Sequence, residues 1–162
     1  MPFTLQPLTV HQLCHLAESR IPPELSSRAA AGALPPAFVA ARSLAQLAEG
    51  KSEFWCSTFL IVRDTDNQVV GGCGFKNEPK AGRVEIGYGV SAECRRQGAA
   101  SAAVRALLTL AFSSGVTEVL AEILSLNAAS VAVVEKLGFK STGVRVTEDN
   151  ETLIQWLAKS DA

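Results

Sequence analysis

The stretch that decides the fold is Val90-Ser91-Ala92-Glu93-Cys94-Arg95-Arg96-Gln97-Gly98-Ala99-Ala100-Ser101, which leads from a strand through a turn into a long helical pattern. Residues 83–90 before it alternate as a strand does, and residues 99–112 after it have apolar side chains at helical spacing. The first N–H groups of a helix have no partner within the helix and attract anions, phosphates above all. The sequence therefore predicts an anion site where this helix begins.

The length and charge of the chain limit the kinds of protein it can be. It has 162 residues, of which 48% are hydrophobic, so we expect one domain over residues 1–162. Lysine and arginine number 15 against 16 aspartates and glutamates. This balance gives no strongly basic surface for nucleic acid or a membrane, so a small or locally recognised partner is expected.

The cysteines and histidines suggest neither a disulfide framework nor a metal site. The four cysteines form no C-x-x-C pair, and reduced cysteines of this kind fit a cytoplasmic protein: Cys14, Cys56, Cys73 and Cys94. His11 and His15 have a metal-ligand spacing, but no third ligand is in view and no metal is expected. The sequence also begins without a signal-peptide pattern and contains no apolar run of the ~18 residues that a membrane span needs.

Helical patterns dominate the first third of the chain, after a short strand at residues 3–8. Thr9 is a plausible N-cap for a helix over 10–20, and two further helices are predicted over 25–32 and 37–49. The last of these has an apolar face that we expect to be its packing surface: Phe38, Ala41, Leu44, Ala45 and Ala48. Because these helices precede the sheet, they are expected to form one wall of a substrate site.

The rest of the chain predicts a sheet. Three successive antiparallel strands are expected at 55–63, 68–76 and 83–90, the first two joined by a turn at 64–67. The run 116–124 should be a central strand parallel to the one at 83–90. The last two strands, at 139–146 and 152–157, should form a hairpin. The fold class is thus α/β, with a mixed, mostly antiparallel sheet flanked by helices.

Two glycines interrupt the strand at 83–90. Gly87 and Gly89 suggest a bulge, which would spread this strand from the parallel one at 116–124 and open a slot for an extended ligand. Backbone N–H groups in the slot, such as that of Val90, could then face a carbonyl of the ligand and stabilise the negative charge that develops on it.

The turn itself has the pattern Arg95-x-x-Gly98-x-Ala100. A residue without a side chain at 98 lets a pyrophosphate approach the backbone, and Arg95 and Arg96 could add charge-assisted contacts. A plain turn that happens to contain a glycine is the alternative, since short glycine motifs have many false positives. A nucleotide-binding P-loop is disfavoured because no Lys-Ser/Thr pair follows Gly98.

Two downstream elements decide between these alternatives. Asn127-Ala-Ala-Ser130 and Glu135-Lys-Leu-Gly-Phe139 cap and close a short helix, with Asn127 as N-cap and Gly138 as C′. Together with the turn they resemble the Gcn5-related N-acetyltransferase (GNAT) superfamily. The resemblance implies acetyl-CoA as co-substrate and a bulged strand that opens its slot.

The resemblance assigns roles only at matching positions. It places the Val90 backbone and Asn127 beside pantetheine, Ser130 near the thiol, and the pyrophosphate against the loop residues Arg95, Arg96, Gln97, Gly98, Ala99, Ala100 and Ser101. The phrase Glu85-Ile-Gly-Tyr-Gly-Val90 looks like the branch that acetylates N-terminal α-amines of ribosomal proteins (the RimJ/RimL-like branch). The tyrosine that often serves as the acid in the superfamily falls on Val134, so that acid is missing.

The remaining residues suggest how catalysis would proceed. At pH 7, deprotonating a lysine costs about 4.6 kcal/mol, whereas an α-amine costs about 1.1 kcal/mol. Glu85, in the strand beside the slot, is the candidate general base, acting through water, although a solvated strand residue is the alternative. Ser130 or a water could protonate the leaving thiolate.

The sequence as a whole thus predicts an acetyl-CoA-dependent N-acetyltransferase that acts by direct transfer in a ternary complex. The acceptor would be a primary amine, either a protein N-terminal α-amine or a small molecule. A catalytically silent acyl-CoA-binding sensor is the alternative, because the cofactor loop is clearer than the acid and base. Specificity would lie in the N-terminal helices and the hairpin at 143–152, and the last strands could pair across a homodimer.

Overall fold

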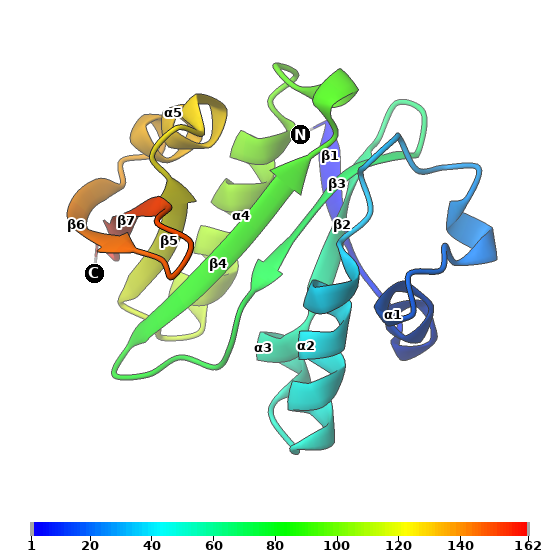
Figure 1. Cartoon of the computed structure of the whole chain (residues 1–162), viewed down its shortest axis with the longest axis horizontal. Helices are drawn as coiled ribbons and strands as arrows, with labels where there is room; N and C mark the ends of the chain where they lie inside the picture. Colours follow the sequence, from blue (N-terminus) through cyan, green and yellow to red (C-terminus); the bar gives the residue numbers. More distant parts are fainter. Residues whose placement is uncertain (1, 162) are drawn as a thin grey trace.

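The computed structural model describes residues 2–161 and contains one seven-stranded sheet (Figure 1). The strand order is β1-β2-β3-β4-β5-β7-β6. The strands are β1 Phe3–Pro7, β2 Thr58–Arg63, β3 Gln68–Phe75, β4 Arg83–Val90, β5 Glu118–Leu124, β6 Lys140–Val146 and β7 Thr152–Lys159. Only β4 and β5 pair in parallel, and every other neighbouring pair is antiparallel. The predicted α/β class and mostly antiparallel sheet are confirmed.

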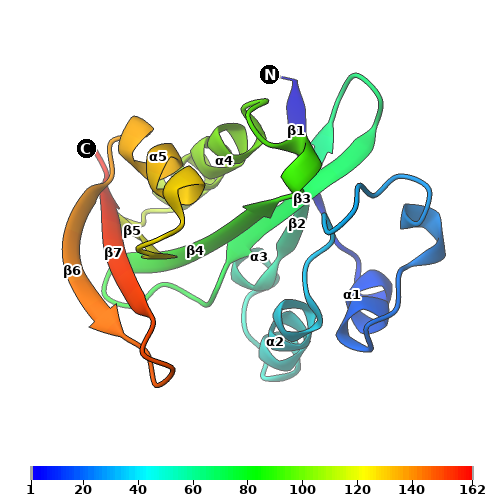
Figure 2. The same cartoon turned by 45° about the horizontal axis from the view of Figure 1, so that its top comes forward.

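The helices lie on both faces of this sheet (Figure 2). The α-helices are α1 Val10–Ala17, α2 Ala37–Ala48, α3 Glu53–Cys56, α4 Ala99–Ser113 and α5 Ala128–Lys136, with short 3₁₀ turns at Pro23–Leu25 and Ala92–Cys94. Helices α4 and α5 cover one face, and α1, α2 and α3 lie on the other. No helix within residues 2–161 is both long and apolar enough to cross a membrane.

Helix α4 is the crossover between the two parallel strands. Its buried side chains pack into the core beside β3 and β4: Ala99, Ala102, Ala103, Val104, Leu107 and Ala111. Its polar residues Arg105 and Thr109, four positions apart, lie on the exposed side of the helix and form a polar stripe. This packing fixes where α4 begins, and hence where its free N–H groups point.

A slot opens because β4 and β5 pair over only three residues. The register joins Arg83–Glu85 to Glu118–Leu120, and beyond it the strands diverge toward their C-terminal ends (Figure 1). The Glu85 carbonyl accepts from the N–H of Lys76, just after β3, and the N–H of Ser91 donates to the Val70 carbonyl. Because bonding alternates along a strand, the N–H groups of Tyr88 and Val90 point the other way, into the slot.

The expected cause of the slot was wrong. Gly87 and Gly89 pair with Gly74 and Gly72 on β3 in unbroken register, so they form no bulge. The register shift lies one strand away, between β2 and β3. The slot results from the divergence of β5 from β4. The glycines instead line a cavity on one face of the sheet.

Two predicted boundaries differ from the structure. Residues 25–32 do not form a helix, because the Arg28 carbonyl accepts from the Val69 N–H on β3 and the Ala30 N–H donates to the Val69 carbonyl, so neither group continues a helix. Trp55 and Cys56, expected in the first central strand, instead end the single turn of α3. In both places contacts with a distant strand outweigh the local pattern.

Of the face predicted for helix α2 only Leu44 packs partly against the core, and the buried face lies opposite. The buried residues are Ala40, Ser43 and Gln46, while Phe38 is 69% exposed. Ser43 Oγ bonds Thr58 Oγ1 at 2.8 Å, and Gln46 Nε2 donates to the Lys76 carbonyl at 2.8 Å. These satisfied polar contacts make a polar face the buried one, and they leave Phe38 beside the sheet.

Candidate active site

The turn before α4 presents free backbone donors at the C-terminal end of β4. Gly98 is the N-cap of α4 with φ +87°, a left-handed conformation that favours glycine, and no side chain among the described residues caps the helix. A Cβ at Gly98 would meet nothing within 4 Å. The first helical bond runs from Ala102 N to Gly98 O, so the N–H groups of residues 99–101 remain available to an anion.

The loop side chains around these donors differ in their exposure. Arg95 and Arg96 are exposed, and Arg96 has φ 65°, an uncommon conformation for a residue with a side chain. Gln97 is held by Arg63, whose Nη1 donates to its Oε1 at 2.6 Å. Ala99 is buried, and Ala100 and Ser101 are partly buried. The loop therefore offers two free arginines and a clear approach to the backbone.

Helix α5 forms the other side of the slot. Asn127 caps it, its Oδ1 accepting from Ser130 N at 3.2 Å, so its amide NH₂ remains free to donate to a ligand. The Tyr88 hydroxyl reaches across from β4 and donates to the Ser130 carbonyl at 3.0 Å. Burial raises the pKa of Tyr88 to about 12, so the phenol stays protonated at neutral pH. Ser130 and Tyr88 thus meet at one point beside the slot.

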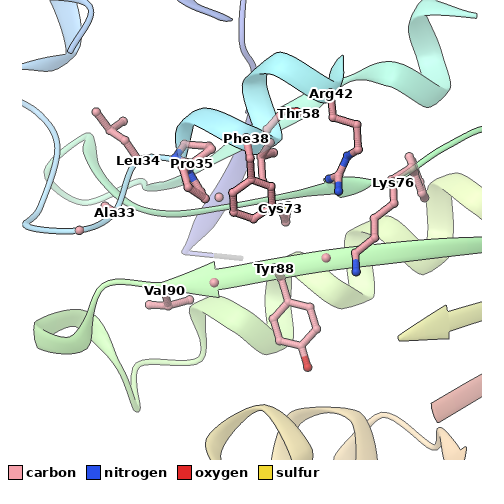
Figure 3. Close-up of a pocket in the computed structure, with 18 residues that line it drawn as sticks. Ala33, Leu34, Pro35, Phe38, Arg42, Thr58, Cys73, Lys76, Tyr88 and Val90 are labelled. Atoms are coloured by element: carbon pink, nitrogen blue, oxygen red, sulfur yellow. The ribbon is translucent and has the colours of Figure 1, made fainter. Parts of the chain in front are cut away.

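A cavity of about 360 Å³ lies between α2 and the ends of β3 and β4 (Figure 3). Paired residues of an antiparallel ladder share a face, so Gly72, Gly74, Gly87 and Gly89 lie on one face of the sheet. All four glycines line the cavity. A Cβ at Gly89 would meet nothing within 4 Å, whereas at Gly72 it would lie 2.9 Å from Pro35. The glycines therefore leave room above the sheet.

The predicted base Glu85 lies on this same face, two residues before Gly87. Its Oε2 accepts from Lys76 Nζ at 2.8 Å, and the two side chains are 28% and 34% exposed. Lys76 lines the cavity, as does Arg42 from α2. The cavity meets the slot at Tyr88 and Val90, so a ligand on either side reaches the same segment of β4.

A model of the acetyltransferase (GNAT) domain matches residues 3–140, which includes the slot and the turn before α4. The chain belongs to the GNAT acetyltransferase family.

Individual relatives of this GNAT domain are distant. The uncharacterized N-acetyltransferase p20 of Bacillus licheniformis is 33% identical over 87 residues, which is 52% of this chain and 48% of that protein. The match thus spans about half the length of this curated relative.

Solved structures share the fold over nearly the whole chain. The ribosomal-protein-S5-alanine acetyltransferase from Vibrio fischeri superposes with a TM-score of 0.70 at 14% identity, covering 99% of this chain and 94% of that one. The RimL ribosomal L7/L12 alpha-N-protein acetyltransferase in complex with coenzyme A gives 0.71 at 17% identity, covering 99% and 96%.

At one position this chain differs from the GNAT pattern in both sequence and structure. Val134, where the superfamily often has a tyrosine acid, is fully buried in α5. Tyr88 is the only tyrosine of the chain, and its hydroxyl donates to the Ser130 carbonyl on the same helix. This contact between β4 and α5 was not predicted, because nothing in the sequence shows that the two elements face each other here.

The GNAT domain also contains a charged network that sequence patterns missed. Glu122 on β5 is 12% exposed and accepts from Arg145 Nε at 3.0 Å, Arg145 Nη2 at 2.9 Å and Gln155 Nε2 at 3.0 Å. These donors, Arg145 first, lower the pKa of Glu122 below its usual value. The network ties β5 to the hairpin of β6 and β7 on the face that carries Glu85.

This network predicts an acid-sensitive contribution to stability. Because the folded-state pKa of Glu122 is lowered, its contribution is complete above the usual value of 4.5 and is lost as the pH falls through the folded value. Glu122→Gln should lower the free energy of unfolding by about 1 kcal/mol near neutral pH, since Arg145 is half exposed. Urea unfolding of both proteins near pH 7 and about pH 3 measures the difference, which should shrink in acid.

A matched control is Glu118→Gln, which breaks a more exposed pair with Arg83 at the other end of β5. Glu118→Gln should lower the free energy of unfolding at neutral pH by less than Glu122→Gln does. A Glu122→Gln difference of equal size at both pH values would contradict the predicted linkage.

Proposed function

We propose that this chain is an acetyl-CoA-dependent N-acetyltransferase that transfers acetyl directly to a primary amine in a ternary complex. One observation carries the proposal: the slot between β4 and β5, with free N–H groups at the start of α4, meets a second cavity at Tyr88–Val90. A ligand in the slot and a second ligand in the cavity would bring their reacting groups together at residues 88–90 of β4, as direct transfer requires.

The residues around the slot fit acetyl-CoA. An extended pantetheine arm needs exposed backbone groups, which β4 offers at residues 88–90, and Asn127 offers its amide from α5. A pyrophosphate needs donors without obstruction, which Gly98 and residues 99–101 offer, with Arg95 and Arg96 beside them. The coenzyme supplies an acetyl group activated as a thioester.

The chain's own groups would manage the charges of the transfer. The Val90 N–H points into the slot, where it can donate to the thioester carbonyl as negative charge develops on its oxygen. Glu85 lies five residues before Val90 on β4, so it would take the proton of the amine through a chain of waters, while the new N–C bond would form and the C–S bond would break. Ser130 would deliver a proton to the departing thiolate.

The acceptor follows from the cost of the neutral amine and from the relatives. An α-amine is cheaper to deprotonate at pH 7 than a lysine by about 3.5 kcal/mol. The relatives from Vibrio fischeri and RimL are named as acetyltransferases of ribosomal proteins. We therefore place protein or peptide N-terminal α-amines first and small-molecule amines second.

The test is the release of free thiol from acetyl-CoA on addition of a panel of peptides, polyamines and aminoglycosides. Acetyl-CoA at about 100 times its Kd should also raise Tm by roughly 5 to 11 °C. Thermal stabilisation without thiol release from any amine would instead support an acyl-CoA sensor. Stabilisation by ATP but not by acetyl-CoA would overturn both.

A further inference from the structure

One cation in the cavity, Arg42, has no partner among the residues that the structure describes. Arg42 extends from α2 toward the middle of β4, near Lys76, and Val90 lies at the other end of the cavity (Figure 3). Arg42 is half buried, yet it makes no hydrogen bond or ion pair with any residue between 2 and 161. Glu85 attracts it, but the carboxylate of Glu85 is bonded to Lys76 instead. A guanidinium removed from water without a partner is costly, so a ligand that supplies one would be favoured.

The other charges near the cavity leave it positive. Lys76 and Glu85 neutralise each other, and so do Arg145 and Glu122 on the neighbouring strands. Arg42 then remains as one uncompensated positive charge. A guanidinium offers a planar fork of donors that matches a carboxylate, with two parallel hydrogen bonds.

The rest of the cavity is apolar and open. Side chains from α2 and the loop before it line the wall, among them Leu34, Pro35, Phe38 and Val39. The volume of about 360 Å³ is in the range of small-ligand sites. An occupant therefore needs an apolar part against this wall and an anionic group near Arg42.

We propose that the cavity binds an acceptor amine that also carries a carboxylate, and that Arg42 holds this carboxylate. The proposal rests on the proposed acetyltransferase function and narrows its acceptor. The carboxylate can belong to a free amino acid or to an Asp or Glu side chain next to a peptide N-terminus. The glycine floor of the cavity consists of Gly72, Gly74, Gly87 and Gly89. With the carboxylate on Arg42, the amine is directed along this floor toward Val90 and the slot.

With the acceptor's carboxylate on Arg42, the charges of the guanidinium and the carboxylate offset each other, and the neutral amine attacks the thioester. The N–C bond then forms as the C–S bond breaks, and the amine proton leaves toward Glu85. Arg42 thus serves recognition of the acceptor, and Glu85 receives the proton.

The experiment compares acceptors that differ only in the carboxylate, on variants that differ only at one arginine. The peptide arm uses N-terminal Leu-Glu and Leu-Gln peptides, and the small-molecule arm uses leucine and leucinamide. The enzymes are the native protein, Arg42→Gln, Arg42→Lys and the control Arg105→Gln, which changes an exposed arginine on the polar stripe of α4. The intrinsic basicity of each amine cancels when its kcat/KM is compared between enzymes.

The expected result is a loss of tenfold or more in kcat/KM for the carboxylate-bearing acceptor with Arg42→Gln, the usual size of a lost charge-assisted hydrogen bond. The matched amide should change little, Arg42→Lys should retain part of the preference, and Arg105→Gln should match the native protein. The arm that shows the effect identifies the source of the carboxylate. Equal losses for acid and amide, or no loss for either, would overturn the proposal.

A binding measurement separates this proposal from the proposed function. Calorimetry with coenzyme A present measures acceptor affinity even if no amine is turned over. Tighter binding of acid than of amide, lost in Arg42→Gln but not in Arg105→Gln, supports the carboxylate site without catalysis. Equal affinities for acid and amide refute the site while leaving acetyl transfer to be judged by thiol release. The acetyl-CoA thermal shift of each variant checks that it is folded.

Discussion

Gly98→Glu is expected to abolish the stabilisation of this protein by acetyl-CoA. The new carboxylate would stand where the pyrophosphate is expected, among the free N–H groups at the start of α4, and would repel it. The native protein should gain about 2.7 kcal/mol from acetyl-CoA at 100 times its Kd, and the variant should gain nothing measurable. Thermal unfolding with and without acetyl-CoA measures the effect.

Gly98→Ala is the matched control for the strain that any side chain causes at this position. Gly98 has φ +87°, so either substitution should lower stability by about 1 kcal/mol without ligand. A Cβ there meets nothing within 4 Å, so alanine should preserve most of the shift with acetyl-CoA. A Gly98→Glu protein that keeps the full shift would show that the pyrophosphate binds elsewhere.

Glu85→Gln is expected to lower kcat by about 10²- to 10⁴-fold, the usual contribution of a general base. The acetyl-CoA thermal shift should persist, because the side chain of Glu85 lies on the face of β4 that carries the glycine floor, away from the pyrophosphate loop. Its bond to Lys76 is partly exposed, so the loss of stability should stay below about 1 kcal/mol. Thiol release under saturating acetyl-CoA measures the effect.

Lys76→Gln distinguishes a catalytic carboxylate from a merely structural ion pair. It breaks the same 2.8 Å contact but leaves the carboxylate of Glu85 in place. If Glu85 is the base, this variant should lose far less activity than Glu85→Gln. Equal losses of activity in the two variants would mean that the ion pair only maintains the structure of the cavity and that another group is the base.

Sequence patterns correctly predicted the turns and helix caps, whose structure depends on interactions between neighbouring residues. The turn at 64–67 joins an antiparallel hairpin, with Asn67 at φ 58°. Thr9 caps α1 through a capping box with Gln12, and Asn127 caps α5. Gly98 begins α4 as expected. Each depends on a few neighbouring residues, so its signal is complete within the sequence.

Predictions from local sequence patterns were wrong where contacts between distant segments determine the structure. Nothing near Arg28 or Ala30 shows that Val69 will take their backbone hydrogen bonds and prevent a helix at 25–32. The polar residues Ser43 and Gln46 form the buried face of α2 because Thr58 and Lys76 lie opposite them, and Phe38 is therefore left beside the cavity. Hydrophobic periodicity cannot foresee a polar face that distant partners satisfy.

The sequence by itself determined the alternation of strands and helices, the free helix start at Gly98 and the motifs that the GNAT family shares, because each of these is local. Only the tertiary structure decided what the glycines of β4 do. Gly87 and Gly89 pair with Gly74 and Gly72 to make an open floor, and the slot arises from the divergence of β5. The tertiary structure also placed Arg42 beside these glycines without a partner among residues 2–161, since burial and pairing depend on which segments of the chain meet.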